Sequence, residues 1–342
     1  MVSEAPPFWW GQTDWRARAL WPASALYGMV AGRRMKNARR ERIDAPVLCV
    51  GNFTVGGTGK TPVAIALAQQ ARRMGLTPGI LSRGHGGSFA APHIVDPAHD
   101  AAKHVGDEPL LLAEHAAVAV SPDRAAGARL LIADRYCDFL IMDDGFQSAR
   151  IHIDYALVVV DALRGLGNGR VVPAGPLRAP LAMQFSYADA LLKMGTGDAA
   201  DIVVRQAARA AKPVFEARAE PRAPEKYAGR RFLAFAGIGH PQKFFDTLAA
   251  TGATVVLAHP FPDHHVFSSD ELDDLATAAS VGQLELITTA KDAARLRHGG
   301  AGDAFLTRLN VLEVDARFDL DHAPERIVTA TVKAWKDRRL KV

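Results

Sequence analysis

One stretch, residues 47–62, constrains this chain more than any other part of it. An apolar run leads into a glycine-rich turn, the turn ends in Gly-Lys-Thr, and a helical pattern follows from Val63 to about Met74. Strand, glycine loop, Lys-Thr and helix is the order of a phosphate-binding P-loop. Glycines let the backbone turn tightly with N–H groups pointing inward, and the helix start adds free N–H donors. The stretch predicts a nucleoside triphosphate site.

Two residues of this stretch have predicted roles toward the phosphates. Lys60 would reach the β- and γ-phosphates, and the Thr61 hydroxyl would bind Mg²⁺. A strict P-loop has glycine where this chain has Thr54, so Gly56 and Gly57 are expected to supply the turn. The alternative, a βα turn with an incidental lysine, accounts less well for the strand before it and the helix after it. The predicted nucleotide-binding residues are Thr54, Val55, Gly56, Gly57, Thr58, Gly59, Lys60 and Thr61.

Strand and helix patterns alternate after the amino-terminal 45 residues. Strand patterns fall at 46–51, 78–82, 117–120, 138–143 and 155–160, and helical patterns at 61–75, 107–116 and 122–135. This alternation is typical of a parallel sheet with helices on both faces, whose ligands lie at the carboxyl ends of the strands. We therefore expect an α/β, P-loop NTPase-like domain over residues 46–222.

A second alternating region starts at Arg231, after a stretch at 212–230 whose scattered Pro, Arg and Glu are typical of a linker. Its strand patterns fall at 232–236, 254–258, 284–288 and 310–314, and its last helical pattern covers 324–337. The sequence predicts a smaller α/β domain over 223–342, with the last helix a candidate for packing back on the first domain.

Carboxylates follow the P-loop in two places. The apolar strand 138–143 ends in Asp143 and Asp144, which are candidates to hold Mg²⁺ directly or through water. Asp107 and Glu108 precede an apolar helix, where acidic residues are ordinary helix-start chemistry. The alternative is a carboxylate that accepts the proton of an attacking hydroxyl.

Basic residues in loops are candidate anion contacts, although each taken alone has a structural explanation as well. They are Arg83 and His85 after the strand at 78–82, Arg124 at a helix start, and Arg170 and Arg178 in the Gly- and Pro-rich loop at 164–180. The triplet at 263–265, Asp-His-His, lacks the further ligands of a dinuclear metal site. A histidine paired with a carboxylate there, tuning a base, is favoured.

The amino-terminal arm, residues 1–45, is unusual in composition. It holds four of the five tryptophans of the chain, and a basic cluster follows between Arg33 and Arg42. Aromatic residues followed by cations suit a helix lying in a membrane interface. A helical arm packed on the protein's own core, with a solvated basic end, explains the same pattern equally well.

Composition excludes several classes of protein. The formal net charge of +4 is too small to indicate a nucleic-acid partner. Cys49 and Cys137 lie in predicted buried strands, which indicates core packing rather than a disulfide framework. The amino terminus does not match a secretory signal, and no apolar run reaches the roughly 18–20 residues of a membrane span. We expect a cytosolic protein.

Taken together, the motifs resemble one family, the tetraacyldisaccharide 4′-kinases or lipid A 4′-kinases, over nearly the whole chain. The matching blocks, in order, are residues 51–62, 81–84, 106–109, 143–147, 173–178, 236–239, 261–265 and 291–292. The family's P-loop also lacks the strict first glycine. This chain departs from the family pattern at His85, His240, Ala179 and Ala290.

The resemblance implies a kinase that moves the γ-phosphoryl group of ATP, with Mg²⁺, to the 4′-hydroxyl of tetraacyldisaccharide 1-phosphate, forming lipid IVA. It implies a peripheral protein at the cytoplasmic face of the bacterial inner membrane, with residues 1–45 as the docking arm. Asp107 looks like the family's catalytic base and His264 like its partner. The implied metal residues are Thr61, Glu108, Asp143 and Asp144, and the candidate substrate residues are Arg83, His85, Arg124, Gln147 and Arg178.

The rival hypothesis is a membrane-associated P-loop ATPase switch that acts on a protein partner. The glycine loop resembles that of partitioning ATPases, but their signature lysine would fall at position 55, where this chain has Val55. ATP consumption without lipid would favour the switch, and lipid-dependent consumption the kinase.

Overall fold

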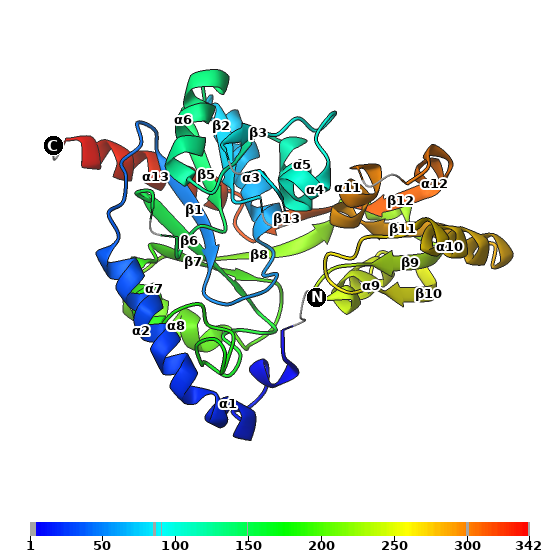
Figure 1. Cartoon of the computed structure of the whole chain (residues 1–342), viewed down its shortest axis with the longest axis horizontal. Coiled ribbons are helices and arrows are strands. Elements are labelled where there is room, and N and C mark those ends of the chain that lie inside the picture. The colour runs from blue at the N-terminus through cyan, green and yellow to red at the C-terminus, as the bar shows by residue number, and fades with distance from the viewer. Residues whose placement is uncertain (1–4, 85–86, 90, 149, 299–300, 341–342) are drawn as a thin grey trace.

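The computed structural model describes residues 5–84, 87–89, 91–148, 150–298 and 301–340. Its strands form two sheets, a nine-stranded one in the order β13-β8-β7-β6-β1-β5-β2-β4-β3 and a four-stranded one in the order β10-β9-β11-β12 (Figure 1). The pairings are parallel except β3 with β4 and β13 with β8. The expected α/β architecture with a large, mostly parallel sheet is confirmed.

The nine-stranded sheet contains β1 (Val47–Asn52), β2 (Pro78–Ser82), β3 (His93–Ile94), β4 (Ala117–Val120), β5 (Phe139–Asp143), β6 (Tyr155–Asp161), β7 (Ala190–Met194), β8 (Val214–Pro221) and β13 (Val314–Phe318). The four-stranded sheet contains β9 (Arg231–Ala236), β10 (Thr254–Pro260), β11 (Glu285–Thr289) and β12 (Leu309–Leu312).

The helices before β8 are η1 (Pro7–Trp9), α1 (Trp15–Ala19), α2 (Trp21–Asn37), α3 (Lys60–Arg73), α4 (Ala102–Val105), α5 (Asp107–Ala113), α6 (Arg124–Arg135), α7 (Leu181–Tyr187) and α8 (Asp201–Arg209). Those after β8 are η2 (Pro224–Lys226), α9 (Pro241–Ala249), α10 (Ser269–Val281), α11 (Ala290–His298), α12 (Asp303–Arg308) and α13 (Ala323–Arg339).

Helices cover both faces of the larger sheet because its central strands are apolar on both sides. Along β1, Leu48 and Val50 join one core with α3, α5 and α13, whereas Val47 and Cys49 join another with α6 and α8. Successive side chains of a strand point to opposite faces, so a strand buried on both sides is a continuous apolar run. This is why β1 holds the P-loop firmly at its carboxyl end.

The chain crosses from the larger sheet to the smaller one and back. We call the part built on the nine-stranded sheet the large lobe (described residues of 5–221 and 314–340) and the rest the small lobe (described residues of 222–313). Figure 1 shows β8 and β13 reaching from the large lobe toward the small one. The small lobe has α9 packed on one face of its sheet and α10 on the other.

Two expectations for this region were wrong. The predicted linker at 212–230 contains β8, where Phe215 and Ala217 are buried while the alternating Glu216 and Arg218 are charged and exposed. That alternation of apolar and charged residues is the pattern of a half-exposed strand. The predicted smaller domain, 223–342, also extends too far, because β13 pairs with β8 in the large lobe. The last helix, α13, packs on α3 of the large lobe, as was expected for it.

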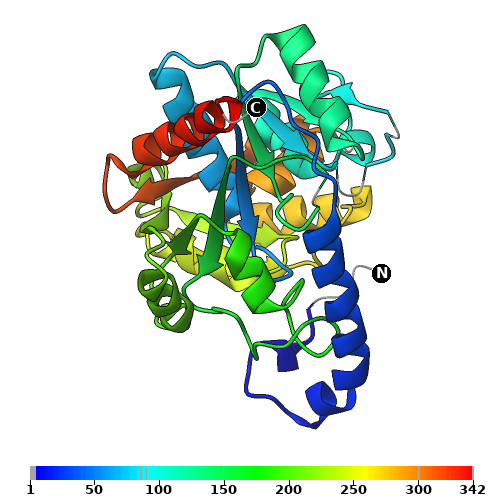
Figure 2. The ribbon, with the colours of Figure 1, turned by 90° about the vertical axis from the view of Figure 1, so that its left-hand side faces the viewer.

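The amino-terminal arm packs on the rest of the large lobe through small residues. In α2, Ser24, Gly28 and Gly32 are buried, and the Ser24 hydroxyl donates a 2.6 Å hydrogen bond to the carbonyl of Val171. A Cβ on Gly28 would lie 3.6 Å from a side-chain carbon of Pro180, so α2 packs closely against the loop at 164–180. Figure 2 shows α2 along one side of the molecule, with α1 at its far end.

The other face of the arm exposes large apolar side chains: Trp15, Leu20, Trp21, Leu26, Tyr27, Met29 and Val30. Trp15 is 72% exposed and Leu26 63% exposed. Within the described residues, none of the helices combines the length and apolar character needed to cross a bilayer.

Candidate active site

The P-loop forms its turn at the glycines that the sequence predicts. Gly56 has a φ of +106° and Gly59 a φ of +82°, a region of backbone space that glycine adopts readily, and α3 starts immediately afterwards at Lys60. Thr54 does not need to be glycine, because it forms an isolated antiparallel bridge with Leu177. The next residue, Val55, donates its N–H to the carbonyl of Pro176 at 2.8 Å. The loop at 164–180 therefore supports the P-loop from one side.

Asp143 and Asp144 lie directly beside the P-loop, since β5 is the neighbour of β1 in the sheet and Asp143 pairs with Val50. Asp143 is buried, and its Oδ1 has no hydrogen-bond partner in the described part of the chain. Burial and the nearby Glu108 raise the pKa of Asp143 to about 7. A buried carboxylate oxygen without a partner at a phosphate site fits a bound cation.

Asp144 has partners of its own. Arg178 donates two hydrogen bonds to its carboxylate, at 2.7 and 2.9 Å, and the Nζ of Lys60 lies 3.9 Å from it. Burial would raise the pKa of Asp144, but these cations outweigh that effect and lower it to about 2. Asp144 therefore orders Lys60 and Arg178 around the loop.

The predicted metal residues come from three elements around the P-loop. Thr61 is buried in the first turn of α3, and Glu108 in α5 forms an ion pair with Lys291 of the small lobe. Across the described residues, no three His, Cys, Asp or Glu side chains gather closely enough to hold a metal by themselves. Mg²⁺ in phosphate sites is held by one or two protein groups, with phosphate and water oxygens completing its shell. Thr61 and Asp143 fit that arrangement.

Asp107 and His264 meet across the two lobes. Asp107 is the first residue of α5, and the Nδ1 of His264 lies 3.3 Å from its Oδ2. Burial would raise the pKa of Asp107, but hydrogen bonds from His264 and Arg295 outweigh burial and hold the pKa well below its usual range. The hydrogen bond to Asp107 raises the pKa of His264 above 6.5. The two residues are an acid–base pair assembled from distant segments of the sequence.

Sequence reasoning assigned no role to two cations of α11. Lys291 pairs with Glu108, and the Nη2 of Arg295 donates a 2.6 Å hydrogen bond to Oδ2 of Asp107. The two cations are four residues apart, so they lie on one face of the helix, and their partners are consecutive residues of α5. The four-residue spacing of the two cations can be read from the sequence, but their partners, 183 and 188 residues away, cannot.

A groove of about 1200 Å³ opens beside this site. Four of the predicted substrate residues, Arg83, Arg124, Gln147 and Arg178, line it together with Asp144 and one side of α2. Its other arginines are Arg33, Arg34, Arg39 and Arg150. His85 lies outside the described residues, and Arg170, also expected to bind anions, does not line the groove. The groove is therefore strongly cationic, and the arm forms part of its lining.

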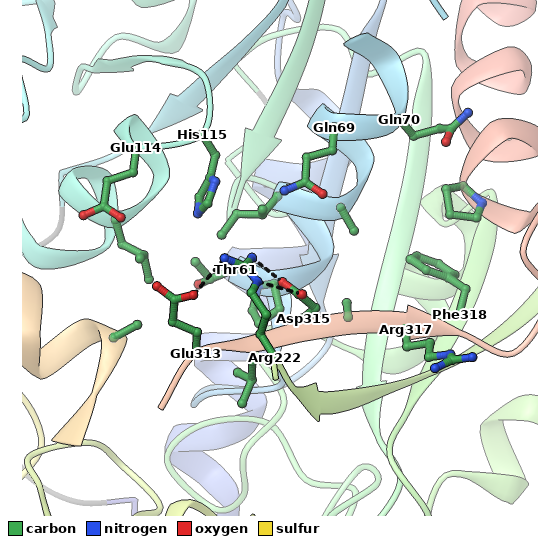
Figure 3. A pocket seen from close by; sticks show the side chains of 18 of the residues that line it. Thr61, Gln69, Gln70, Glu114, His115, Arg222, Glu313, Asp315, Arg317 and Phe318 are labelled. Carbon is green, nitrogen blue, oxygen red and sulfur yellow. Dashed lines mark hydrogen bonds and ion pairs between the residues drawn. The ribbon is translucent and has the colours of Figure 1, made fainter. Parts of the chain in front are cut away.

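A smaller cavity of about 340 Å³ lies on the other side of the P-loop helix (Figure 3). Thr61 and Gln69 of α3 face it, and so does Arg222, which follows β8. Arg222 forms ion pairs with Glu313 at 2.8 Å and Asp315 at 2.6 Å, so it joins the two strands that link the lobes.

Comparison with known proteins decides the family. A family model described as tetraacyldisaccharide-1-P 4′-kinase, LpxK, matches residues 16–333. This chain belongs to the tetraacyldisaccharide 4′-kinase family. A tetraacyldisaccharide 4′-kinase of Mesorhizobium japonicum is 70% identical over the full length of both chains, and one of Brucella anthropi is 56% identical over 99% of both.

A solved structure of the tetraacyldisaccharide 4′-kinase family has the same fold. It is LpxK from Aquifex aeolicus, crystallised in complex with ATP, with a TM-score of 0.71 and 25% identity over 93% of this chain and 99% of that one. The family assignment agrees with the resemblance inferred from the P-loop and the later motifs.

Proposed function

We propose that this chain transfers the γ-phosphoryl group of ATP to the 4′-hydroxyl of tetraacyldisaccharide 1-phosphate, forming lipid IVA in lipid A biosynthesis. We further propose that it works as a peripheral protein at the cytoplasmic face of the inner membrane. The observation that carries the proposal is the position of Asp107. It forms an acid–base pair with His264, and this pair lies beside the P-loop. A cationic groove of about 1200 Å³, lined by Asp144 and several arginines, opens beside it.

Each part of the site has a task in such a transfer. Phosphoryl transfer needs positioning and neutralisation of charge more than covalent chemistry. Lys60 and the P-loop amides bind the β- and γ-phosphates, while Asp107 takes the proton of the attacking hydroxyl and His264 tunes that carboxylate. Thr61 and Asp143, with Glu108 and Asp144 nearby, would hold Mg²⁺, which when bound neutralises charge on the phosphates. The arginine groove binds the phosphorylated sugar, and the arm meets the lipid surface.

The deciding experiment follows radioactive γ-phosphate from ATP into lipid. We expect label in the disaccharide only when tetraacyldisaccharide 1-phosphate is supplied, and ATP consumption only in its presence. Steady hydrolysis of ATP without lipid, and no labelled lipid, would instead point to an ATPase switch.

Activity should depend on pH through His264. Asp107, Asp263 and Arg295 are among the charged groups around its ring. Once protonated, the imidazole places a full positive charge beside Asp107 and makes that carboxylate a weaker base, so kcat should fall as pH drops through a raised pKa above 6.5. A pH series of kcat should show this acidic limb, and His264→Gln should remove it. An unchanged limb in that variant would assign the titration to another group.

The stability of the lobe contact should change in the opposite direction. Because the folded pKa of His264 is raised, its contribution is fully present below the unfolded value of 6.5 and is lost as pH rises through the folded pKa. The contact is therefore strongest at a pH where catalysis is weakest.

The exposed face of the arm should drive binding to lipid. We expect the triple variant Trp15→Ser, Trp21→Ser and Leu26→Ser to bind anionic phospholipid vesicles about 100-fold more weakly, since each side chain loses roughly 1 kcal/mol or more of apolar burial. Vesicle flotation measures this. Tyr136→Ser is the matched control, because Tyr136 is 82% exposed but lies at the end of α6. Equal binding by triple variant and wild type would refute the docking role.

A further inference from the structure

Arg295 is a buried cation whose position is fixed within the small lobe. Its Nη1 donates hydrogen bonds to the Oδ1 of Asp292 at 2.8 Å, the carbonyl of His265 at 3.0 Å and the carbonyl of Gly237 at 3.4 Å. A guanidinium is planar and rigid, so three acceptors around one nitrogen also fix the direction of the other. That other nitrogen, Nη2, points across the lobe boundary to Asp107.

Asp292 holds Arg295 in turn. Asp292 is fully buried, and its Oδ2 accepts hydrogen bonds from the N–H of Gly237 at 3.0 Å and the Thr289 hydroxyl at 2.7 Å. Both carboxylate oxygens are thus committed within the small lobe. A buried charge pair held by hydrogen bonds on both carboxylate oxygens is rigid, because movement would leave a buried charge unpaired.

Arg295 and His264 act on the same oxygen of the base. The Nη2 of Arg295 lies 2.6 Å from Oδ2 of Asp107, and the Nδ1 of His264 lies 3.3 Å from that same atom. With Oδ2 held by two small-lobe groups, the carboxylate is fixed in rotation, and the proton is assigned to the other oxygen, Oδ1. Side-chain orientation of this kind matters in phosphoryl transfer, where misplacement by about 1 Å costs roughly 100-fold in rate.

We propose that Arg295 is a positioning residue for the phosphoryl transfer: it anchors Oδ2 of Asp107 to the small lobe so that Oδ1 faces the acceptor hydroxyl. The proposal rests on the assignment of Asp107 as the base. It gives the small lobe a direct part in the chemistry, since the base is oriented only while the two lobes are in contact. Arg295 itself does not touch the substrate.

The test compares Arg295→Met and Arg295→Lys with a matched control, Arg297→Ala. Arg297 belongs to the same helix and pairs with Glu114 at the end of α5 at 3.0 Å, but it is half exposed and away from Asp107. We expect Arg295→Met to lower kcat about 100-fold with the KM for ATP within about twofold. Arg295→Lys, which keeps the charge beside Asp292, should recover part of that loss, and Arg297→Ala should behave as wild type.

Two further measurements separate positioning from a purely structural role. Removing Arg295 takes away a positive charge that lowers the pKa of His264, so the acidic limb of kcat should move to higher pH. In an Asp107→Asn background, Arg295→Met should have little further effect on kcat, because the two residues act as one unit.

Three results would overturn the proposal. They are wild-type kcat in Arg295→Met, an unshifted pH limb, or an equal loss of kcat with and without Asp107. If Asp107→Asn alone is fully active, the assignment of the base fails and the proposal fails with it. If Asp107→Asn is inactive and Arg295→Met is active, only the role of Arg295 is refuted.

Discussion

Asp107→Asn should lower kcat by about 100- to 10,000-fold, the range for a positioned general base. Asparagine has nearly the same shape, and its side-chain oxygen can still accept the hydrogen bond that Arg295 donates to Asp107. It cannot take a proton from a hydroxyl, so binding should survive while chemistry is lost. Steady-state kinetics with varied ATP and varied lipid measures the split between kcat and KM.

The control for this substitution is Asp303→Asn. Asp303 is exposed in the first turn of α12, so the same chemical change there should leave kcat unaltered. Turnover of Asp107→Asn at the wild-type rate would remove Asp107 from the role of base. A rise in KM for ATP with kcat unchanged would assign it to nucleotide binding instead.

Lys60→Ala should have the second large effect, a loss of about 100- to 1000-fold in kcat together with weaker ATP binding. The Lys60 side chain is mostly buried at the start of α3, and Nζ is 3.9 Å from Asp144. Alanine removes a positive charge from the phosphate site and leaves the carboxylate of Asp144 with Arg178 as its principal cation. Calorimetric titration with ATP and steady-state turnover check the two effects separately.

A lysine elsewhere provides the comparison for Lys60→Ala. Lys103→Ala in α4 removes the same charge from an exposed position and should change neither quantity measurably. If Lys60→Ala binds ATP as well as wild type and turns over at the same rate, the glycine loop at 56–59 does not hold the phosphates in the way that its sequence predicts.

Most of the large lobe could be predicted from local sequence patterns. The P-loop was predictable because strand, glycine turn and helix start are all encoded within residues 47–62. The strand β5 and its terminal aspartates were predictable because an apolar run ends abruptly in charge. In contrast, β8 was missed because its outward residues, Glu216 and Arg218 among them, give it the composition of a linker.

Contacts between the lobes could not be inferred from local sequence. The pairing of Asp107 with His264 came from the family resemblance, and no spacing rule links residues so far apart. Arg295 had no such support, because its function depends on which surface of α5 the helix α11 meets. The same limit applies to Asp144, whose two hydrogen bonds from Arg178 across the P-loop were not predicted.

The return of the chain to the large lobe has a consequence for its biosynthesis. The apolar face of α3 is covered by β13 and α13, with Phe318, Ile327 and Val328 in the same core as Val63 and Leu67. A ribosome makes these covering segments after the whole small lobe. A nascent chain therefore exposes the helix behind its phosphate loop until synthesis has passed through the small lobe.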